Sequence, residues 1–279
     1  MSRGKPTKSP LKAKPVRTPG QSLDEQRRRL FDDYLATPAF MLVGALAVCI
    51  TQWHAYLGDH PPRPWLWTFV LLLAVVFVIY RFLKILPVAR NLRQGAEGER
   101  AVGQYLEGLR EKGYKVFHDI IAGGFNLDHV AIGPGGVFTI ETKTWSKPAR
   151  GEAVIHFNGS ELRVLDGPGN PNPIIQAKAQ AAWLKALLLE STGRTVDIRP
   201  VVVFPGWYIK SAPQARTALW VLNPKALSKF LDNQAPQLDV ETVNLLSYHL
   251  SRYIRARESE LEREQRSFRN AVRKRPLPE

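Results

Sequence analysis

Two long apolar segments near the amino terminus constrain this chain more than any other feature of its sequence. The first, residues 38–57, contains no Lys, Arg, Asp or Glu. The second, residues 65–86, is uncharged up to Tyr80 and carries two cations near its end. A helix of about 20 residues spans the roughly 30 Å of hydrocarbon in a bilayer. We therefore expect a transmembrane helical hairpin over residues 35–88.

Aromatic residues mark the two ends of the connection between these segments. Trp53 and Tyr56 close the first, and Trp65 and Trp67 open the second, as in the aromatic belts at membrane interfaces. The connection, residues 58–64, is short and rich in proline. A helical hairpin buried in a soluble core is the alternative, but uncharged runs flanked by aromatic residues and cations favour a membrane.

Positive charge lies mostly outside the connection. Residues 1–34 and the stretch that follows the second segment are rich in Lys and Arg, whereas the connection offers only Arg63. The positive-inside rule then places both termini and the soluble part in the cytoplasm. We expect residues 1–34 to be a disordered basic tail, since the first 20 are rich in Lys, Pro, Ser and Thr.

The overall charge and the cysteine content limit the classes of partner and site. The formal net charge of +14 favours anionic partners, either nucleic acid or lipid headgroups. Cys49 is the only cysteine, which excludes an intrachain disulfide and a cysteine-based zinc site.

The rest of the chain has the pattern of an α/β domain with a mixed central sheet flanked by helices. We assign this domain to residues 91–235, followed by a carboxyl-terminal helix and basic tail over residues 236–279. Helices are expected over residues 95–110, 174–189 and 240 to about 275, and strands over 114–121, 127–132, 137–143, 153–157, 161–165, 201–204 and 218–222.

One predicted hairpin brings two carboxylates and an ammonium group together. If Gly133–Gly136 is the loop, Ile132 pairs with Val137, and Asp128 falls opposite Glu141. Opposite residues of an antiparallel pair share a face, with Cβ atoms about 4.5–5.5 Å apart. Lys143, two residues beyond Glu141, lies on the same face.

Two carboxylates this close repel one another unless a cation or a shared proton intervenes. Mg²⁺, which prefers carboxylate and water oxygens, would relieve the repulsion, and Mn²⁺ is the alternative ion. The ammonium group of Lys143 would then act on an attacking water or on the charge that develops at a phosphate. The other interpretation is a cross-strand salt bridge at an exposed sheet edge.

Several motifs resemble those of the nuclease-related domain family, over roughly Gly95 to Phe204. They are Gly95-Ala-Glu-Gly-Glu-Arg100, Leu127-Asp-His-Val130, Gly133-Pro-Gly-Gly-Val137, Ile140-Glu-Thr-Lys143, and Asn172-Pro173 followed by Gln176. The resemblance implies a restriction-endonuclease-like fold. It also implies that Asp128 and Glu141 are metal ligands, that Lys143 is the catalytic lysine, that Glu99 is an accessory acid and that Gln176 assists from a helix.

Basic and aromatic residues follow the strand that carries Glu141. Trp145, Lys147 and Arg150 are candidates for phosphate contact or for stacking on an unpaired base. A solvated loop is the alternative interpretation.

The function predicted from the sequence is that of an integral membrane protein with a metal-dependent nuclease domain. It would hydrolyse phosphodiester bonds of nucleic acid, DNA rather than RNA, on the cytoplasmic side. The alternative is a catalytically inactive module that binds nucleic acid or protein at the membrane. A purely structural membrane protein would leave the carboxylate–lysine face without a role.

Overall fold

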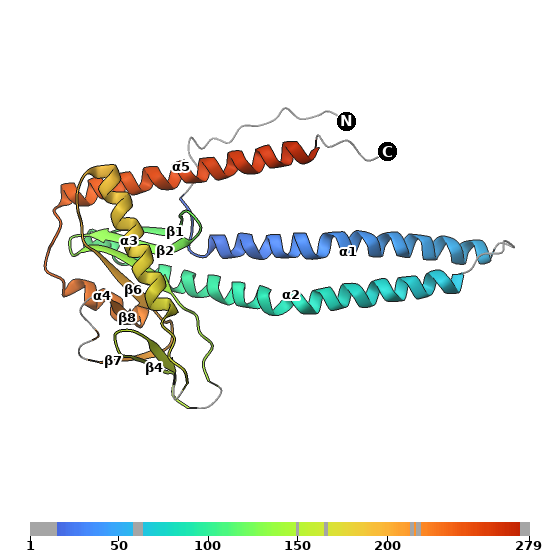
Figure 1. The fold of residues 1–279 in the computed structure, drawn as a ribbon, viewed down its shortest axis with the longest axis horizontal. Coiled ribbons are helices and arrows are strands. Elements are labelled where there is room, and N and C mark those ends of the chain that lie inside the picture. The colour runs from blue at the N-terminus through green and yellow to red at the C-terminus, as the bar shows by residue number, and fades with distance from the viewer. Residues whose placement is uncertain are drawn as a thin grey trace. The chain divides into compact units, whose positions relative to one another are not determined.

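The computed structural model describes residues 16–57, 64–148, 151–164, 167–212, 215 and 219–273. Residues 1–15 of the basic tail, most of the proline-rich connection, and Arg150 lie outside the described residues. The chain divides into two compact units, which are described separately: Gly20–Gly98, and Met1–Pro19 together with Glu99–Glu279. Figure 1 shows the elements of both units.

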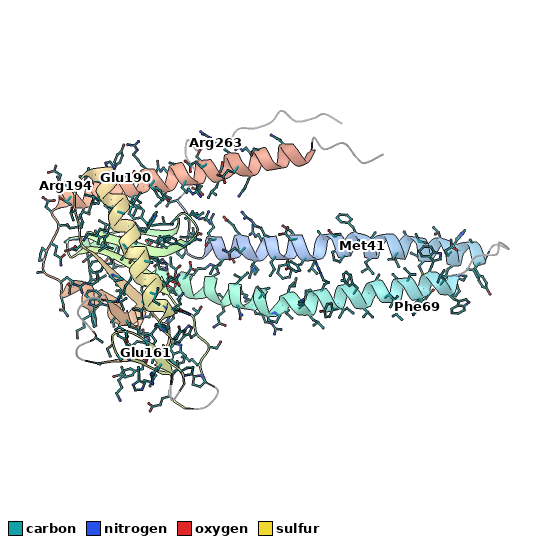
Figure 2. All side chains as sticks on the ribbon, in the orientation of Figure 1. Met41, Phe69, Glu161, Glu190, Arg194 and Arg263 are labelled. Carbon is teal, nitrogen blue, oxygen red and sulfur yellow. The ribbon has the colours of Figure 1, made fainter. Side chains whose placement is uncertain are left out.

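The first unit contains two long helices, α1 (Gln21–Tyr56) and the larger part of α2 (Pro64–Glu107). Both are long and apolar enough to cross a bilayer, with mean hydropathies of 1.9 and 2.5 over their most apolar windows. Large apolar side chains on both helices are exposed, including Met41 (62%) and Phe69 (57%), which are labelled in Figure 2. Such exposure suits contact with lipid better than contact with water.

Polar and aromatic contacts join the two helices near both ends of the pair. The indole Nε1 of Trp53 donates to Thr68 Oγ1 at 2.9 Å, and the rings of Trp53 and Trp65 are 5.1 Å apart. Towards the other end, Arg81 donates to the backbone oxygen of Tyr34 at 3.2 Å and lies over the Tyr34 ring. In a lipid environment the hydrophobic effect does not favour association of two apolar helices, so hydrogen bonds of this kind help to select which helix faces pack together.

The helices extend further than the sequence pattern indicated. Residues 21–34, which we assigned to a disordered tail, belong to α1. Local pairs on the helix surface support this charged extension: Gln21 donates to Glu25 at 2.9 Å, and Arg27 lies 3.6 Å from Asp24. Likewise, α2 is one helix where two were expected, because it continues through Pro87 into the second unit.

The second unit is built on two sheets. The larger sheet has the strand order β1 (Lys115–Ile121), β2 (Asn126–Gly133), β3 (Gly136–Thr142), β6 (Ile198–Val203), β8 (Trp220–Leu222), and the smaller has the order β5 (Leu162–Val164), β4 (Val154–Phe157), β7 (Tyr208–Ser211). In the larger sheet β1, β2 and β3 are antiparallel, whereas β3, β6 and β8 are parallel. The prediction of an α/β domain with a mixed central sheet is thereby confirmed.

Helices cover the larger sheet and complete the core. They are the end of α2, the short η1 (Arg110–Lys112), α3 (Asn172–Thr192), α4 (Pro224–Asp232) and α5 (Val240–Arg273). Val102 and Leu106 of α2 pack with Phe138 of β3 in one buried cluster. Leu184 of α3 and Leu246 of α5 pack with strand residues in another. The elements β7 and α4 were not predicted: β7 has only four residues, whereas α4 carries local signals, an Asn223 N-cap, a proline at its first position and an apolar face, that we did not use in the prediction.

A buried ion pair ties the segment before α1 to the second unit. Arg17 Nε donates to Asp119 Oδ2 at 2.8 Å, and both side chains are almost fully buried. Asp119 has a φ of 49°, a left-handed conformation that Asp and Asn adopt more readily than most residues. Next to this pair, Pro19 packs so closely on Gly103 that a Cβ there would lie 2.6 Å from the proline ring.

We expect Arg17→Met to lower the stability of the second unit, because it leaves a buried carboxylate without its cation. The expected loss is about 3 kcal/mol, or roughly 6–12 °C in Tm, measured by thermal unfolding of the detergent-purified full chain. Arg17→Met combined with Asp119→Asn should recover much of it. The control Arg27→Met breaks only the exposed pair with Asp24 and should change Tm little. Equal effects of both single variants would contradict this view of the pair.

Candidate functional site

The hairpin of β2 and β3 has the register that the sequence predicted. Ile132 pairs with Val137, and the pairing continues to His129 and Ile140. Extending it by one position sets Asp128 opposite Glu141. The connection is tighter than expected, because Gly133 and Gly136 also pair and only two residues remain in the turn. Gly136 has a φ of 121°, a conformation open to glycine and not to larger residues.

Asp128 lies at the open end of the β2–β3 hairpin, where its side chain, and not a backbone carbonyl, accepts a hydrogen bond from β3. Its Oδ2 accepts the backbone N–H of Thr142 at 2.7 Å. Asp128 as a whole is half-buried, and its carboxyl group is desolvated.

Glu141 is buried beside Asp128, and both of its oxygens have donors. Lys143 Nζ donates to Oε1 at 2.6 Å, and Gln180 Nε2 donates to Oε2 at 2.5 Å. The side chain of Glu141 is 3% exposed and that of Lys143 is 25% exposed. The ammonium group of Lys143 therefore remains within reach of a bound molecule, while Glu141 is fixed in position.

Helix α3 closes the other side of the group. Gln176 Oε1 accepts from Lys143 Nζ at 2.8 Å, and one turn further along, Gln180 reaches Glu141. Gln180 Nε2 also donates to the backbone oxygen of Asn126 at 2.9 Å. Gln180 is 1% exposed, and its Oε1 atom has no hydrogen-bond partner in the described structure.

Sequence reasoning missed Gln180. The signal was present in its position four residues after Gln176, because residues i and i+4 share a face of a helix. A polar side chain on the same face as the buried Ala177 and Leu184 needs a polar partner inside the domain.

The electrostatics of the site are dominated by negative charge. The pKa of Asp128 lies well above its ordinary value, first because of desolvation and then because of repulsion by Glu141 and Glu99. The Thr142 N–H and the charge of Lys143 act in the opposite direction and do not offset these effects. Glu99, which is buried on α2, is thus close enough to act on the Asp128 carboxyl, and its role as an accessory acid stays a prediction.

The donor set of this site fits a divalent ion that keeps part of its water shell. Within the described residues, no group of three or more His, Cys, Asp or Glu side chains is arranged to hold a metal ion. Mg²⁺ is commonly held by one or two carboxylates, with water and phosphate oxygens completing its shell. Asp128 and Glu141 supply two carboxylates, and a cation between them would relieve the repulsion that raises the pKa of Asp128.

The predicted nucleic-acid contacts take different positions. Trp145 is half-buried and packs on Phe204 with ring centroids 4.8 Å apart, so its ring is partly occupied by the core. Lys147 is exposed, and its Nζ lies beside Gly206. Arg150 lies outside the described residues.

His129 belongs to a polar cluster of its own. Its Nδ1 is 2.8 Å from Nδ1 of His118, whose Nε2 is 3.2 Å from Glu107 Oε1. Burial, together with the neighbouring His118, lowers the pKa of His129 well below its usual value. His129 is thus a fully buried core residue whose neutral form is favoured, and it lies outside the carboxylate–lysine group.

The carboxylate–lysine group lies at the carboxyl end of parallel strands. The backbone N–H of Lys143 donates to Val203 at the end of β6, and Phe204 N–H donates to Leu222 at the end of β8, at 2.9 and 3.0 Å. In open α/β sheets this edge is where ligands usually bind. Strands β4 and β5 of the smaller sheet follow β3 in the chain, and β7 follows β6. The segments that lead into the smaller sheet therefore leave the larger sheet at the carboxyl ends of β3 and β6.

Comparison with solved structures gives two weak similarities. SfsA of Pyrococcus furiosus in complex with Ca²⁺ is 18% identical, with a TM-score of 0.22 over 46% of this chain and 54% of that one. Protein VC1899 from Vibrio cholerae is 13% identical, with a TM-score of 0.22 over 87% of this chain and 58% of that one. The chain thus matches little more than half the length of either protein, and these scores do not specify a fold.

Among curated proteins, no sequence matches this chain. A family model gives the informative comparison, because residues 94–205 match the model described as the nuclease-related domain. The match contains Glu99, both hairpin carboxylates, Lys143 and the glutamines of α3. The family-model match at residues 94–205 agrees with the resemblance that the order of the motifs predicted.

Proposed function

We propose that the chain is a membrane-anchored, metal-dependent nuclease with a restriction-endonuclease-like domain that hydrolyses nucleic-acid phosphodiester bonds in the cytoplasm. One observation carries the proposal: Asp128, Glu141 and Lys143 meet at the carboxyl edge of the central sheet, with Gln176 and Gln180 behind them. Two carboxylates that repel one another are costly to a fold, and a cation-dependent activity accounts for keeping them.

Asp128 and Glu141 are the residues that would hold Mg²⁺ or Mn²⁺, which would polarise a phosphate oxygen and lower the pKa of a bound water. Gln180 and Lys143 hold the Glu141 carboxylate in one orientation. Glu99 adds negative charge that favours a cation at this place.

Lys143 is the group best placed to act on the substrate. Its ammonium is partly exposed and is oriented by Glu141 and Gln176. Donation from this ammonium to a phosphate oxygen would stabilise the charge that develops while the water oxygen bonds to phosphorus and the bond to the leaving oxygen breaks.

The buried Arg17–Asp119 pair supports the proposed topology. Arg17 precedes α1, whereas Asp119 follows α2, and the two side chains are in direct contact. If both helices cross the bilayer, the segment before them and the domain after them lie on the same side. The excess of Lys and Arg at these ends favours the cytoplasm.

One observation favours the competing function, a catalytically inactive module that binds nucleic acid at the membrane. Both oxygens of Glu141 already accept hydrogen bonds, so an ion has to share them or displace Lys143. The first experiment below separates the two functions.

We expect the full chain, purified in detergent, to cleave DNA with Mg²⁺ or Mn²⁺ and not with EDTA. Asp128→Asn and Lys143→Ala should each lower the rate at least about 100-fold, because each removes charge at the reacting phosphate. The control Lys185→Ala removes an exposed lysine that pairs with Asp197 and should keep the rate of the parent. Agarose-gel assays on plasmid, linear and single-stranded DNA, and on RNA, give the substrate preference.

Metal-dependent cleavage that persists in both site variants would place the activity elsewhere. A folded parent that binds nucleic acid and cleaves none of these substrates would support the inactive module instead.

We expect Asp128→Asn to raise the Tm of the metal-free chain at pH 7 by a few degrees. The folded state holds the Asp128 proton to a higher pH than the unfolded chain, whose Asp pKa is about 3.9, so ionisation above that pH costs stability. Asparagine keeps an oxygen for the Thr142 N–H and carries no charge. The advantage should vanish as the pH falls towards 4. Mg²⁺ should raise the Tm of the parent and not that of the variant.

Asp197→Asn is the matched control for this measurement. Asp197 is exposed and its pKa is lowered by a hydrogen bond from Lys185, so its loss should not stabilise the protein. A lower Tm for Asp128→Asn than for the parent in EDTA would contradict the repulsion that we infer at the site.

The topology is tested with single cysteines in a Cys49→Ala background. His60→Cys, in the proline-rich connection, should react with a membrane-impermeant maleimide in intact cells. Ser267→Cys, on α5, should react only after permeabilisation, because we place it in the cytoplasm. Labelling of Ser267→Cys in intact cells, or protection of both sites until permeabilisation, would refute the two-span arrangement proposed here.

A further inference from the structure

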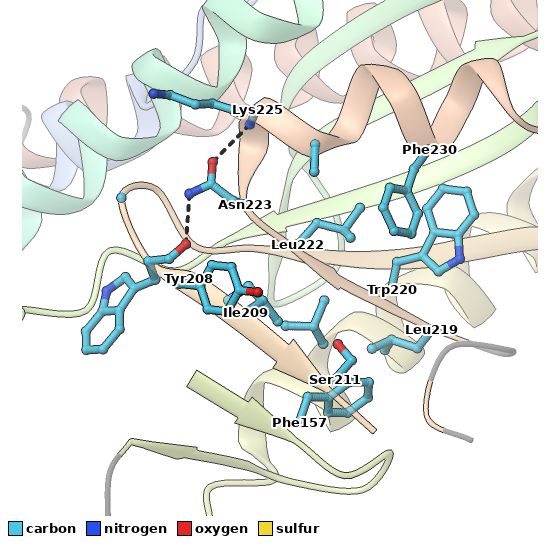
Figure 3. A pocket seen from close by; sticks show the side chains of 14 residues that line it. Phe157, Tyr208, Ile209, Ser211, Leu219, Trp220, Leu222, Asn223, Lys225 and Phe230 are labelled. Atoms are coloured by element: carbon cyan, nitrogen blue, oxygen red, sulfur yellow. Dashed lines mark hydrogen bonds between the residues drawn. The ribbon is translucent and has the colours of Figure 1, made fainter. Parts of the chain in front are cut away.

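A pocket of about 530 Å³ lies beside the free edge of β8, between α4 and the smaller sheet (Figure 3). Five of its fourteen lining residues are aromatic: Phe157, Trp207, Tyr208, Trp220 and Phe230. Tyr208 is 67% exposed, so its ring is available to a ligand. Small-ligand pockets have volumes of about 300–1,000 Å³ and mainly apolar walls with a few polar groups.

The polar groups of this pocket come from the strand edge and from the start of α4. β8 ends the larger sheet, and its Leu222 carbonyl bonds across to Phe204 of β6. Because carbonyls alternate along a strand, the peptide groups of Val221 face the free edge. Asn223 does not add a free group, since it caps α4 through Lys225 N and donates to the Trp207 carbonyl.

The charge around the pocket is positive. Lys225 lines it and is exposed, and Lys147 lies against Gly206 in its wall. None of the described lining residues is Asp or Glu. The pocket therefore offers an anionic molecule two cations and no opposing carboxylate.

The pocket is close to the carboxylate–lysine group along the chain and along the sheet edge. Lys143 N–H bonds to Val203, and Gly206 of the pocket wall follows only three residues later, at most roughly 11 Å away. β3 and β8 are separated by β6 alone, which sets them about 10 Å apart.

We propose that this pocket binds an unpaired base of a single nucleic-acid strand, with Lys225 and Lys147 contacting the phosphates on either side of it. The exposed ring of Tyr208 accepts the base by stacking, with the other aromatic residues forming the apolar walls, and the peptide groups of Val221 meet the hydrogen-bonding edge of the base. The inference rests on the proposed function for its substrate class, and it names single-stranded or locally opened nucleic acid as the form bound beside Lys143. A paired base, whose faces are covered by its neighbours, does not enter such a pocket.

The test measures binding rather than cleavage. The full chain in detergent, kept in EDTA, is titrated into a fluorescent single-stranded oligonucleotide and into a blunt duplex of the same sequence, and anisotropy is recorded. Ala226→Trp fills the pocket from α4, and Tyr208→Ala removes an exposed ring without touching the core. Each should weaken single-strand binding about tenfold and leave duplex binding unchanged.

A matched pair of charge reversals tests the phosphate contact. Lys225→Glu and Lys229→Glu change the same charge one turn apart on α4, and only Lys225 lines the pocket. Lys225→Glu should weaken single-strand binding about tenfold, and more strongly at low salt, whereas Lys229→Glu should weaken it less than about twofold.

Several results would overturn the pocket assignment. Unchanged single-strand affinity in Ala226→Trp and Tyr208→Ala would do so, as would an equal loss of duplex binding. Native mass spectrometry could instead find an acyl chain bound to the parent and none bound to Ala226→Trp, while Ala226→Trp still binds the oligonucleotide. That result would show that the pocket binds a lipid and not a base.

These outcomes are distinguishable from failure of the nuclease itself. If the parent cleaves with Mg²⁺ and the pocket variants bind single strands as tightly as the parent does, the base site alone is overturned. Selective loss of single-strand binding in those variants, with no cleavage by the parent, supports the base site and overturns the nuclease.

Discussion

Repulsion between two neighbouring carboxylates governs the form of this domain. The β2–β3 register brings Asp128 next to Glu141, and burial strengthens the repulsion by removing water. The domain responds with the Thr142 N–H on Asp128 and with Lys143 and Gln180 on Glu141. These donors fix both groups without neutralising them, since the pKa of Asp128 remains raised. A fold that needed only stability would be served as well by an apolar pair, and the remaining repulsion is one of the observations from which we propose a cation at this site.

The same constraint explains why the parallel part of the sheet matters. Strands β3, β6 and β8 end together, which aligns Lys143, Gly206 and Asn223 along one edge. The chain after β3 forms two strands of the smaller sheet before it returns as α3 with Gln176 and Gln180. Catalytic candidates, cations and an aromatic pocket thus come from the segments that leave or enter a single edge. This clustering follows from the topology of the sheet, because the loops that leave parallel strands all lie at the same edge.

The parts of the site that were predictable are those set by local periodicity. Asp128, Glu141 and Lys143 follow from one hairpin, whose glycines define the turn and whose alternation defines the faces. Gln180 was missed because its meaning depends on how α3 packs on β3, which no local pattern encodes. The same holds for β7, which has four residues and contacts the cluster around Trp207. Local signals existed for α4, which begins at an Asn223 N-cap and has an apolar face, and for residues 21–34, where Leu23, Leu30 and Phe31 recur at helical spacing and Arg27 pairs with Asp24, but the charge of residues 21–34 favoured a disordered tail.

The chain enters the second unit at two places, before α1 and at the end of α2. The domain holds the chain at Arg17, before α1, and again through α2, which continues to Glu107. Loss of the Arg17 contact would remove a cation from the buried Asp119 carboxylate. The segment before α1 is therefore held in place mainly by an ion pair and less by buried apolar area. Asp119 directly follows His118, whose Nδ1 lies 2.8 Å from Nδ1 of His129, and His129 directly follows Asp128 on β2. Two buried side-chain contacts, Arg17–Asp119 and His118–His129, therefore link the segment before α1 to the strand that carries the first carboxylate, with the backbone joining the neighbouring residues between them.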